Sequence, residues 1–187
     1  MDDVLEKEDM TISATFAGHS PRQQLFDIPA YNDLLGLSNV VHSAKTMRDK
    51  WHGVTKLHQA TAKAIKNIAK VLPDAEKELL SAKLLDPQGT WLDNGLDLVQ
   101  KLQRASDALK VIPIYGYYVS WQIDVKIIIP LWNLLIDIMR HDLSIKATHE
   151  EFASLEPYLP KRMPKEEGIL DAMANIIMAP FVKKSHA

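Results

Sequence analysis

Apolar residues recur along residues 37–72 at alternating steps of three and four, the spacing of one helix face. The positions are Leu37, Val40, Ala44, Met47, Trp51, Val54, His58, Ile65, Ile68 and Leu72. No proline lies between Pro29 and Pro73. The pattern predicts one amphipathic helix of roughly 50 Å, with Gly53 marking a bend.

Similar patterns and capping signals predict helices along the rest of the chain. Pro73, followed by acidic residues, is typical of a helix start, and residues 86–89 have the composition of a turn. Thr90 resembles an N-cap for a helix that ends at Pro113. Further helices are predicted from Pro130 to about Leu143, from Thr148 to just before Pro157, and over residues 165–179.

Residues 114–129 fit two patterns. Val119, Trp121, Ile123, Val125 and Ile127 alternate with more polar neighbours, as in a strand, whereas a second set of apolar positions fits a helix face. No other segment alternates convincingly, and a lone strand is not stable. We therefore interpret the segment as helical, and the fold class as all-α, a single-domain helical bundle.

The first 30 residues lack helical periodicity and carry Gly18, Ser20, Pro21 and Pro29. We expect residues 1–30 to form a polar, acidic, flexible tail ahead of an all-helical domain at 31–187. Phe16, Leu25, Phe26 and Ile28 would attach its later part to the core. The acidic N-terminus does not fit a signal or transit peptide, so we expect a cytoplasmic protein.

Composition narrows the function classes. The chain has 187 residues, no cysteine and a formal net charge of −2, which argues against a disulfide scaffold, a thiolate metal site and broad nucleic-acid binding. Residues 111–139 are the most apolar stretch, but charged residues and prolines interrupt them. We expect this stretch to be buried or to lie at an interface, and not to span a membrane.

Charge is concentrated in one block. Residues 37–72 carry seven bases and one acid, whereas residues 1–36 carry seven acids and two bases. The basic block has three interpretations: a solvated helix face, a surface that attracts the phosphates of lipid headgroups, or a surface covered by the acidic tail.

Catalytic and cofactor motifs are missing from the sequence: it contains no glycine-rich phosphate loop, zinc-helix motif or serine nucleophile elbow. Asp137 and His141 lie one helical turn apart, but a metal needs three or four converging ligands. We therefore expect no catalytic residues, no metal and no cofactor, and a protein that is not an enzyme.

Aromatic residues supply the candidate contacts with membranes. Trp121 lies between polar neighbours and close to Tyr117 and Tyr118. Tryptophan and tyrosine favour boundaries between apolar and aqueous phases, because their rings are apolar and their polar atoms form hydrogen bonds. These three residues are the predicted membrane-docking residues.

Two segments resemble a known family. Residues 91–99, Trp-Leu-Asp-Asn-Gly-Leu-Asp-Leu-Val, resemble the Trp-Leu-x-x-Gly-Leu helix of the glycolipid transfer protein family, and residues 49–57 resemble that family's Asp-x-x-x-Asn-x-x-Lys helix. The resemblance implies a two-layer helical sandwich that holds a sphingolipid. It implies Asp49 and Lys56 as headgroup contacts and Trp91 as the stacking platform under the sugar. Gly53 stands at the headgroup position where the family has asparagine.

These observations lead to one functional hypothesis and two alternatives. We expect non-enzymatic binding or intermembrane transfer of a sphingolipid or glycolipid, with its tails in an apolar cavity and the protein peripheral to membranes. One alternative is a helical adaptor or assembly subunit with a protein partner along residues 37–72. The other is a membrane-associating helical protein that binds the lipid surface directly.

Overall fold

The computed structural model describes residues 19–164, and this part of the chain is helical, with no strand. Its helices are α2 (Pro21–Phe26), α3 (Ala30–Ser43), α4 (Met47–Glu78), α5 (Thr90–Leu109), α6 (Tyr115–Ile123), the π-helix η1 (Asp124–Ile128), α7 (Ile129–Lys146), α8 (His149–Leu155) and the short 3-10 helix η2 (Glu156–Tyr158). The all-α single-domain bundle is confirmed.

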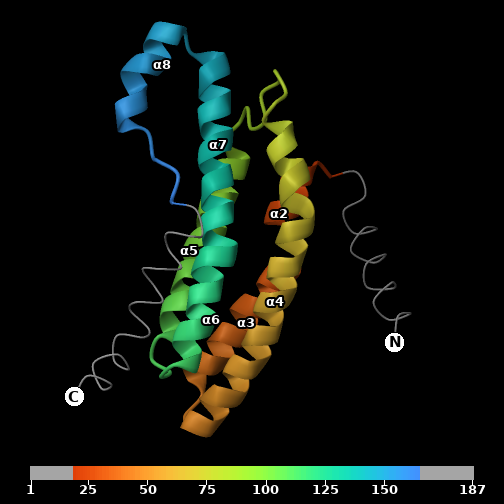
Figure 1. Cartoon of the computed structure of the whole chain (residues 1–187), viewed down its shortest axis with the longest axis vertical. Helices are drawn as coiled ribbons and strands as arrows, with labels where there is room; N and C mark the ends of the chain where they lie inside the picture. Colours follow the sequence, from red (N-terminus) through yellow and green to blue (C-terminus); the bar gives the residue numbers. More distant parts are fainter. Residues whose placement is uncertain (1–18, 165–187) are drawn as a thin grey trace, which may run out of the picture.

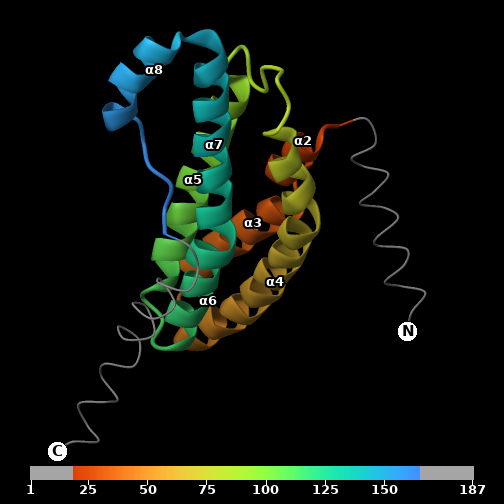
Figure 2. The ribbon, with the colours of Figure 1, turned by 45° about the horizontal axis from the view of Figure 1, so that its top comes forward.

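The bundle is elongated, and its long helices run along its length (Figure 1). The helix α4 lies on one side, α5 and the α6–α7 column lie on the other, and α3 crosses between them (Figure 2). The shared core is aliphatic, with Leu34, Leu57, Leu102, Ile123 and Leu131 among its fully buried side chains. No helix within residues 19–164 is long and apolar enough to cross a membrane.

The predicted boundary between a flexible tail and the helical domain, at residue 30, is wrong, because residues 21–26 already form the helix α2. Ser20 caps α2, because its side chain accepts from the Gln23 amide while the Gln23 side chain accepts from the Ser20 amide. Leu25, Phe26 and Ile28 are buried, as their expected attachment to the core requires. Phe16 and the rest of residues 1–18 lie outside the described residues.

The predicted helix over residues 37–72 is two helices joined at residues 44–46. The Thr46 hydroxyl accepts the Asp49 amide at 3.1 Å and starts α4, and the Lys50 ammonium donates to the Val41 carbonyl at the end of α3. Gly53 lies inside α4, which stays helical through this position. It lets α3 and α4 approach closely, since a Cβ there would lie 2.6 Å from a methyl group of Val41.

Pro73 lies inside α4, so the prediction that it starts a helix is wrong. The helix continues to Glu78, where Arg22 of α2 forms an ion pair at 3.0 Å. Burial of Ala75 in the last turns of α4 helps explain why this end stays helical.

Residues 114–129 are helical, as predicted, but they are not one regular helix. Ile114 begins the segment with φ 61° and ψ −67°, and the Tyr115 amide donates to the Pro113 carbonyl at 2.7 Å, which defines a tight γ-turn. The π-helix η1 then separates α6 from α7. Neither irregularity was predicted from the sequence.

The loop between α4 and α5 is held by two buried carboxylates. Asp142 of α7 accepts the amides of Leu85 and Asp86 at 2.7 and 2.6 Å. Asp86 in turn accepts the amides of Trp91 and Leu92, at 3.2 and 2.9 Å. The turn at residues 86–89 is confirmed, but Thr90 is not the N-cap of α5: Gly89 holds that position, and the Asp86 carboxylate accepts amides in the first turn of the helix.

The helix predicted from Thr148 is confirmed as α8, and Thr148 and Glu151 form a capping box at its start. This helix buries none of its residues and arches away from α7 (Figure 1). The predicted helix over residues 165–179 lies outside the described residues.

Candidate functional site

The structure does not bring the predicted headgroup residues together. Trp91 packs on Phe26 of α2 with ring centroids 5.3 Å apart, near the end of α4 where Arg22 pairs with Glu78. Asp49 lies in the first turn of α4, and 29 residues separate it from Glu78, roughly 43 Å along the helix. A single site built from Asp49, Lys56 and Trp91 is therefore wrong, because the length of α4 separates its parts.

Each predicted headgroup residue has a different environment. Gly53 is buried against α3, and Lys56 and Asp49 are exposed on α4. Trp91 lines a small groove of about 350 Å³ between α2 and α5, together with Asn94 and Asp97. Family-like headgroup recognition has no common pocket here.

Aromatic side chains form a continuous row between α4 and α6, which we call the aromatic seam. The centroid of Trp51 lies 5.1 Å from that of Tyr115, and His58 lies 5.6 Å from both Tyr115 and Tyr118. Tyr118 stacks on Trp121 at 6.1 Å. The seam therefore runs in the order Trp51, Tyr115, His58, Tyr118, Trp121.

The seam is ordered by polar contacts and remains open to solvent. The Tyr115 hydroxyl lies 2.9 Å from His58 Nδ1, and the Gln122 amide donates to the Tyr118 hydroxyl at 3.0 Å. Trp51 is 48% exposed and Tyr118 is 42% exposed. His58 lies within the seam between Tyr115, which is partly buried, and Tyr118, which is exposed.

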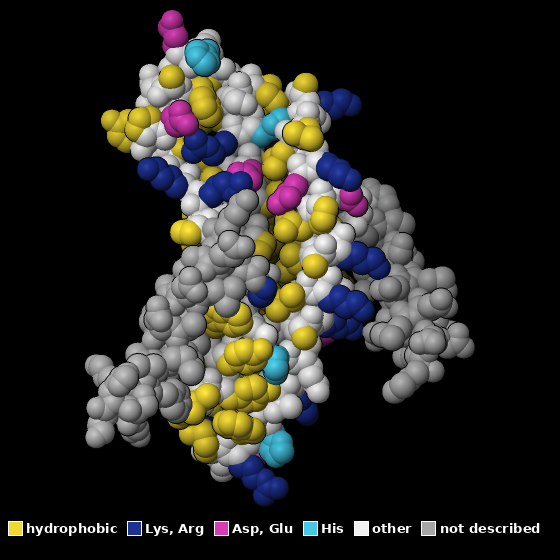
Figure 3. All heavy atoms as spheres, in the orientation of Figure 1, with side chains coloured by type: hydrophobic (Ala, Val, Ile, Leu, Met, Phe, Trp, Pro, Cys, Tyr) yellow, Lys and Arg dark blue, Asp and Glu magenta, His cyan; other side chains and the backbone are white. Residues whose placement is uncertain are grey.

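An apolar tip continues the seam to the end of the bundle. We use this name for Met47, Val111, Ile114 and Tyr117, which are all exposed. Ile114 is 59% exposed at the centre of the γ-turn, a backbone conformation that is strained for a β-branched residue. Figure 3 shows hydrophobic side chains gathered over the lower part of this face.

Ser106, Ser120 and Asp124 form a compact polar network between α5 and α6, and two polar atoms of the neighbouring residues have no partner among the described residues. Ser106 donates to Asp124 at 2.6 Å and lies 2.7 Å from the Ser120 hydroxyl. Burial raises the pKa of the Asp124 carboxyl, although the Ser106 hydrogen bond and Lys110 lower it. Trp121 Nε1 and Gln122 Oε1 are buried without a hydrogen-bond partner in the part of the chain described.

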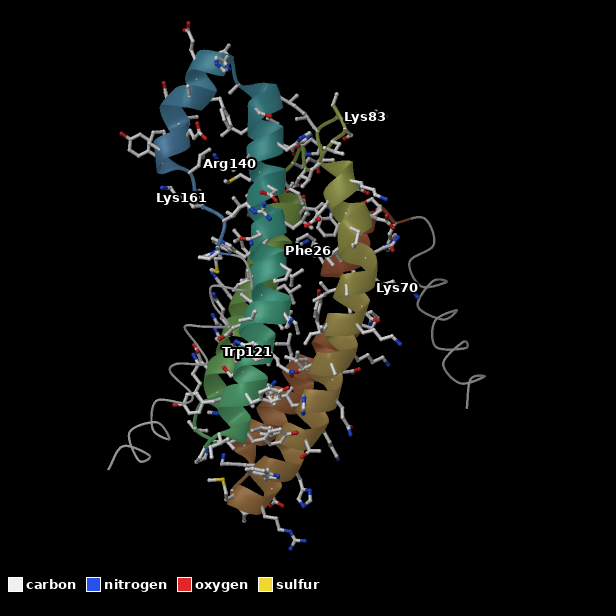
Figure 4. The ribbon with its side chains drawn as sticks, in the orientation of Figure 1. Phe26, Lys70, Lys83, Trp121, Arg140 and Lys161 are labelled. Atoms are coloured by element: carbon white, nitrogen blue, oxygen red, sulfur yellow. The ribbon has the colours of Figure 1, made fainter. Side chains whose placement is uncertain are left out.

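Basic side chains follow the outer face of α4. Lys56, Lys63, Lys70 and Lys77 are spaced seven residues apart, and with Lys66 they form what we call the basic stripe; all five are exposed. Lys70 points away from the bundle in Figure 4, and dark-blue side chains line this edge of α4 in Figure 3.

Residues 19–164 hold no group of three or more side chains arranged to bind a metal. Asp137 faces Arg162 at 3.6 Å, whereas His141 Nε2 lies 3.0 Å from the Lys83 carbonyl. Burial raises the pKa of Asp137, against Arg162 and Arg140, which lower it. The two residues serve separate contacts.

Three of the seam and tip residues were predicted from the sequence as docking residues, and the others were not. Trp121, Tyr117 and Tyr118 lie side by side on α6, with the rings of Tyr118 and Trp121 stacked. Trp51 and His58 are seven residues apart on α4, and Tyr115 lies three before Tyr118. That spacing is the signal that could have identified two facing aromatic stripes.

Comparison with known proteins gives no match: no family model, no curated protein and no solved structure is similar to this chain.

Proposed function

We propose that this protein is a non-enzymatic, peripheral membrane-binding protein that docks through the aromatic seam and the apolar tip. The observation that carries the proposal is the row of five rings in mutual contact, with Trp51 and Tyr118 nearly half exposed, that continues into exposed aliphatic side chains. Tyrosine and tryptophan side chains suit the membrane interface, where their rings enter the apolar phase and their polar atoms stay hydrated.

Burial of apolar area supplies the affinity. Exposed apolar surface contributes about 25 cal/mol per Å² when it leaves water. Met47, Val111 and Ile114 project from neighbouring turns at one end of the bundle, so they can enter a bilayer together. The strained γ-turn supports the same interpretation, since backbone strain is commonly found at functional sites.

Charge supplies the preference for anionic lipids. Lys45 and Arg48 are exposed beside Met47, and the basic stripe runs along the outer face of α4. A lysine or arginine close to an anionic leaflet contributes about 1 kcal/mol, and salt screens this attraction. We therefore expect tighter binding to anionic than to zwitterionic vesicles, and weaker binding as salt is added.

The adaptor alternative has less support from the geometry. Its docking face along residues 37–72 contains Val54, Leu57, Ala64 and Ile68, which are buried in the core against the chain's own helices. A partner helix would have to displace α3 or α2 to reach them. A protein partner would instead compete for the aromatic seam.

Vesicle flotation tests the proposal. Wild-type protein is compared with Trp51→Ala/Tyr118→Ala, on phosphatidylcholine vesicles and on vesicles that also contain phosphatidylglycerol. We expect the wild type to float with the anionic vesicles and the double variant to bind about tenfold more weakly, equivalent to about 1.4 kcal/mol. The matched control is Leu80→Ala/Tyr158→Ala, which removes two highly exposed side chains elsewhere. Equal binding by all three proteins, or no flotation of the wild type, would reject the proposal.

Lipid transfer would require a further property, the extraction of a lipid from the bilayer. Native mass spectrometry after incubation with sphingolipid-containing vesicles distinguishes the two. A stoichiometric lipid adduct extends the proposal to lipid carriage, and a clean protein mass limits it to surface binding.

A further inference from the structure

A groove of about 550 Å³ runs between α3 and α5, whereas the aromatic seam lies between α4 and α6. Both helices of the groove run toward the end of the bundle that carries the apolar tip (Figure 2). The groove lies along the later turns of each helix. Ser38, Asn39 and His42 line it from α3, and Lys101, Arg104 and Ala108 line it from α5.

Short side chains create the hollow. Ala105 and Ala108 leave space where longer residues would fill the gap between the helices. Ser38 is buried, and its hydroxyl lies 3.5 Å from the Ala105 carbonyl, a long and weak hydrogen bond. The hydroxyl can therefore turn toward a ligand at little cost.

The rim of the groove is basic. Within residues 19–164, the Arg104 guanidinium takes part in no hydrogen bond or ion pair, so its five N–H donors are not engaged by the protein. Lys101 pairs with Asp97 at 2.8 Å, but both side chains are mostly exposed and the pair is weak. None of the described residues that line the groove is acidic.

We propose that this groove binds a phosphate group. A guanidinium binds phosphate with two parallel hydrogen bonds, and a phosphate offers further oxygens to donors on the opposite wall. Arg104 and Lys101 stand on one wall, and the side chains of Asn39 and His42 supply donors on the other. A tetrahedral anion can use both walls at once.

The phosphate has two possible sources: the headgroup of an anionic lipid, or a soluble phosphate compound. The position of the groove near the apolar tip favours the headgroup, and this choice of source rests on the proposed membrane function. The binding chemistry itself does not depend on it.

Nuclear magnetic resonance tests the site without membranes. Inorganic phosphate is titrated into ¹⁵N-labelled full-length protein at constant ionic strength, with chloride as the reference anion. We expect saturable shifts at the amides of Ser38, Asn39, His42 and Ala105. We expect binding to be roughly ten- to hundredfold weaker in Arg104→Gln, since charged hydrogen bonds are lost.

Two further variants test whether the shape of the groove and its local charge are both needed for phosphate binding. Ala108→Leu fills the hollow without changing the charge and is expected to weaken phosphate binding as well. Lys83→Gln removes one positive charge near the opposite end of the bundle and should leave binding unchanged (Figure 4). Absence of saturable shifts in the wild type, or equal binding by the wild type and Arg104→Gln, would overturn the proposal.

A vesicle-binding experiment identifies the source of the phosphate. Wild-type protein and Arg104→Gln are compared on phosphatidic acid vesicles and on phosphatidylglycerol vesicles. A selective loss on phosphatidic acid assigns a lipid headgroup, whereas equal vesicle binding with weakened binding of free phosphate assigns a soluble compound. If wild-type protein binds no vesicles, the membrane function fails while the titration still decides the phosphate site.

Discussion

The two ends of the bundle are built differently. At the end near the loop between α4 and α5, buried carboxylates of Asp86 and Asp142 accept four backbone amides between them. At the other end, Ile114 occupies a strained turn and Trp121 Nε1 has no partner among the described residues. The first end satisfies its polar groups internally, whereas the second leaves a buried polar atom without a partner within residues 19–164 and apolar side chains exposed to solvent.

The largest expected effect is on stability, at the carboxylate end. Asp142→Ala removes two short charge-assisted hydrogen bonds and releases the loop from α7. We expect the free energy of unfolding, measured by chemical denaturation, to fall by about 3–5 kcal/mol. Asp74→Ala, which removes an exposed pair with Lys77, should cost less than about 1 kcal/mol. If Asp142→Ala lowers the free energy of unfolding no more than Asp74→Ala does, the contrast between the two ends is contradicted.

The second effect is on binding, at the aromatic end. Trp51→Ala/Tyr118→Ala should weaken vesicle binding about tenfold, as proposed above, yet change stability by less than Asp142→Ala does. Both side chains are nearly half exposed, so their truncation leaves little buried space empty. Thermal unfolding and flotation of the same preparation measure the two quantities, and unfolding of the variant at assay temperature would contradict the contrast.

A smaller effect tests the γ-turn. Ile114→Gly relieves a strained backbone and removes an exposed apolar side chain in one substitution. We expect unfolding free energy to rise by up to about 1 kcal/mol, because relief of strain outweighs the added chain entropy. Vesicle binding should fall at the same time. A variant that is both less stable and unchanged in binding would show that Ile114 serves packing.

The subtlest test is the pH dependence at Asp124. Burial raises its pKa in the folded protein, so folding disfavours the ionised form, and stability increases as pH falls from the raised pKa toward the ordinary value of 3.8. Asp124→Asn keeps an acceptor for Ser106 but cannot ionise. We therefore expect the variant to be more stable than wild type at pH 7, with the difference disappearing near pH 4.

Denaturation series at several pH values measure this difference directly. Asp137, whose pKa burial also raises, titrates in both proteins and cancels in the comparison. A difference that is independent of pH would contradict the assignment to Asp124.

The all-α fold class could be predicted from the sequence, because the spacing of apolar residues indicates a helix and the face that it buries. The pattern did not reveal the break at residues 44–46, since α3 and α4 both place apolar residues against the same core and the periodicity continues across the turn. The capping residues could have revealed where these helices begin. Thr46 with Asp49, and Ser20 with Gln23, are local signals of helix starts.

The site was only partly predictable for a different reason. Trp121, Tyr117 and Tyr118 are neighbours in sequence, whereas the seam also needs Trp51 and His58 from α4. Pairing between distant helices depends on how α4 packs on α6, which no local pattern specifies. The same dependence separates Trp91 from Asp49, and the resemblance to the glycolipid transfer protein family stays a prediction.

Hydrogen–deuterium exchange in the presence and absence of anionic vesicles tests the central claim most directly. We expect vesicles to protect residues 47–58 and 111–122, which carry the seam and the tip, and to leave residues 80–92 and 149–160 unchanged. Protection confined to residues 80–92 or 149–160, or no protection anywhere while the protein floats with the vesicles, would contradict docking through the aromatic end.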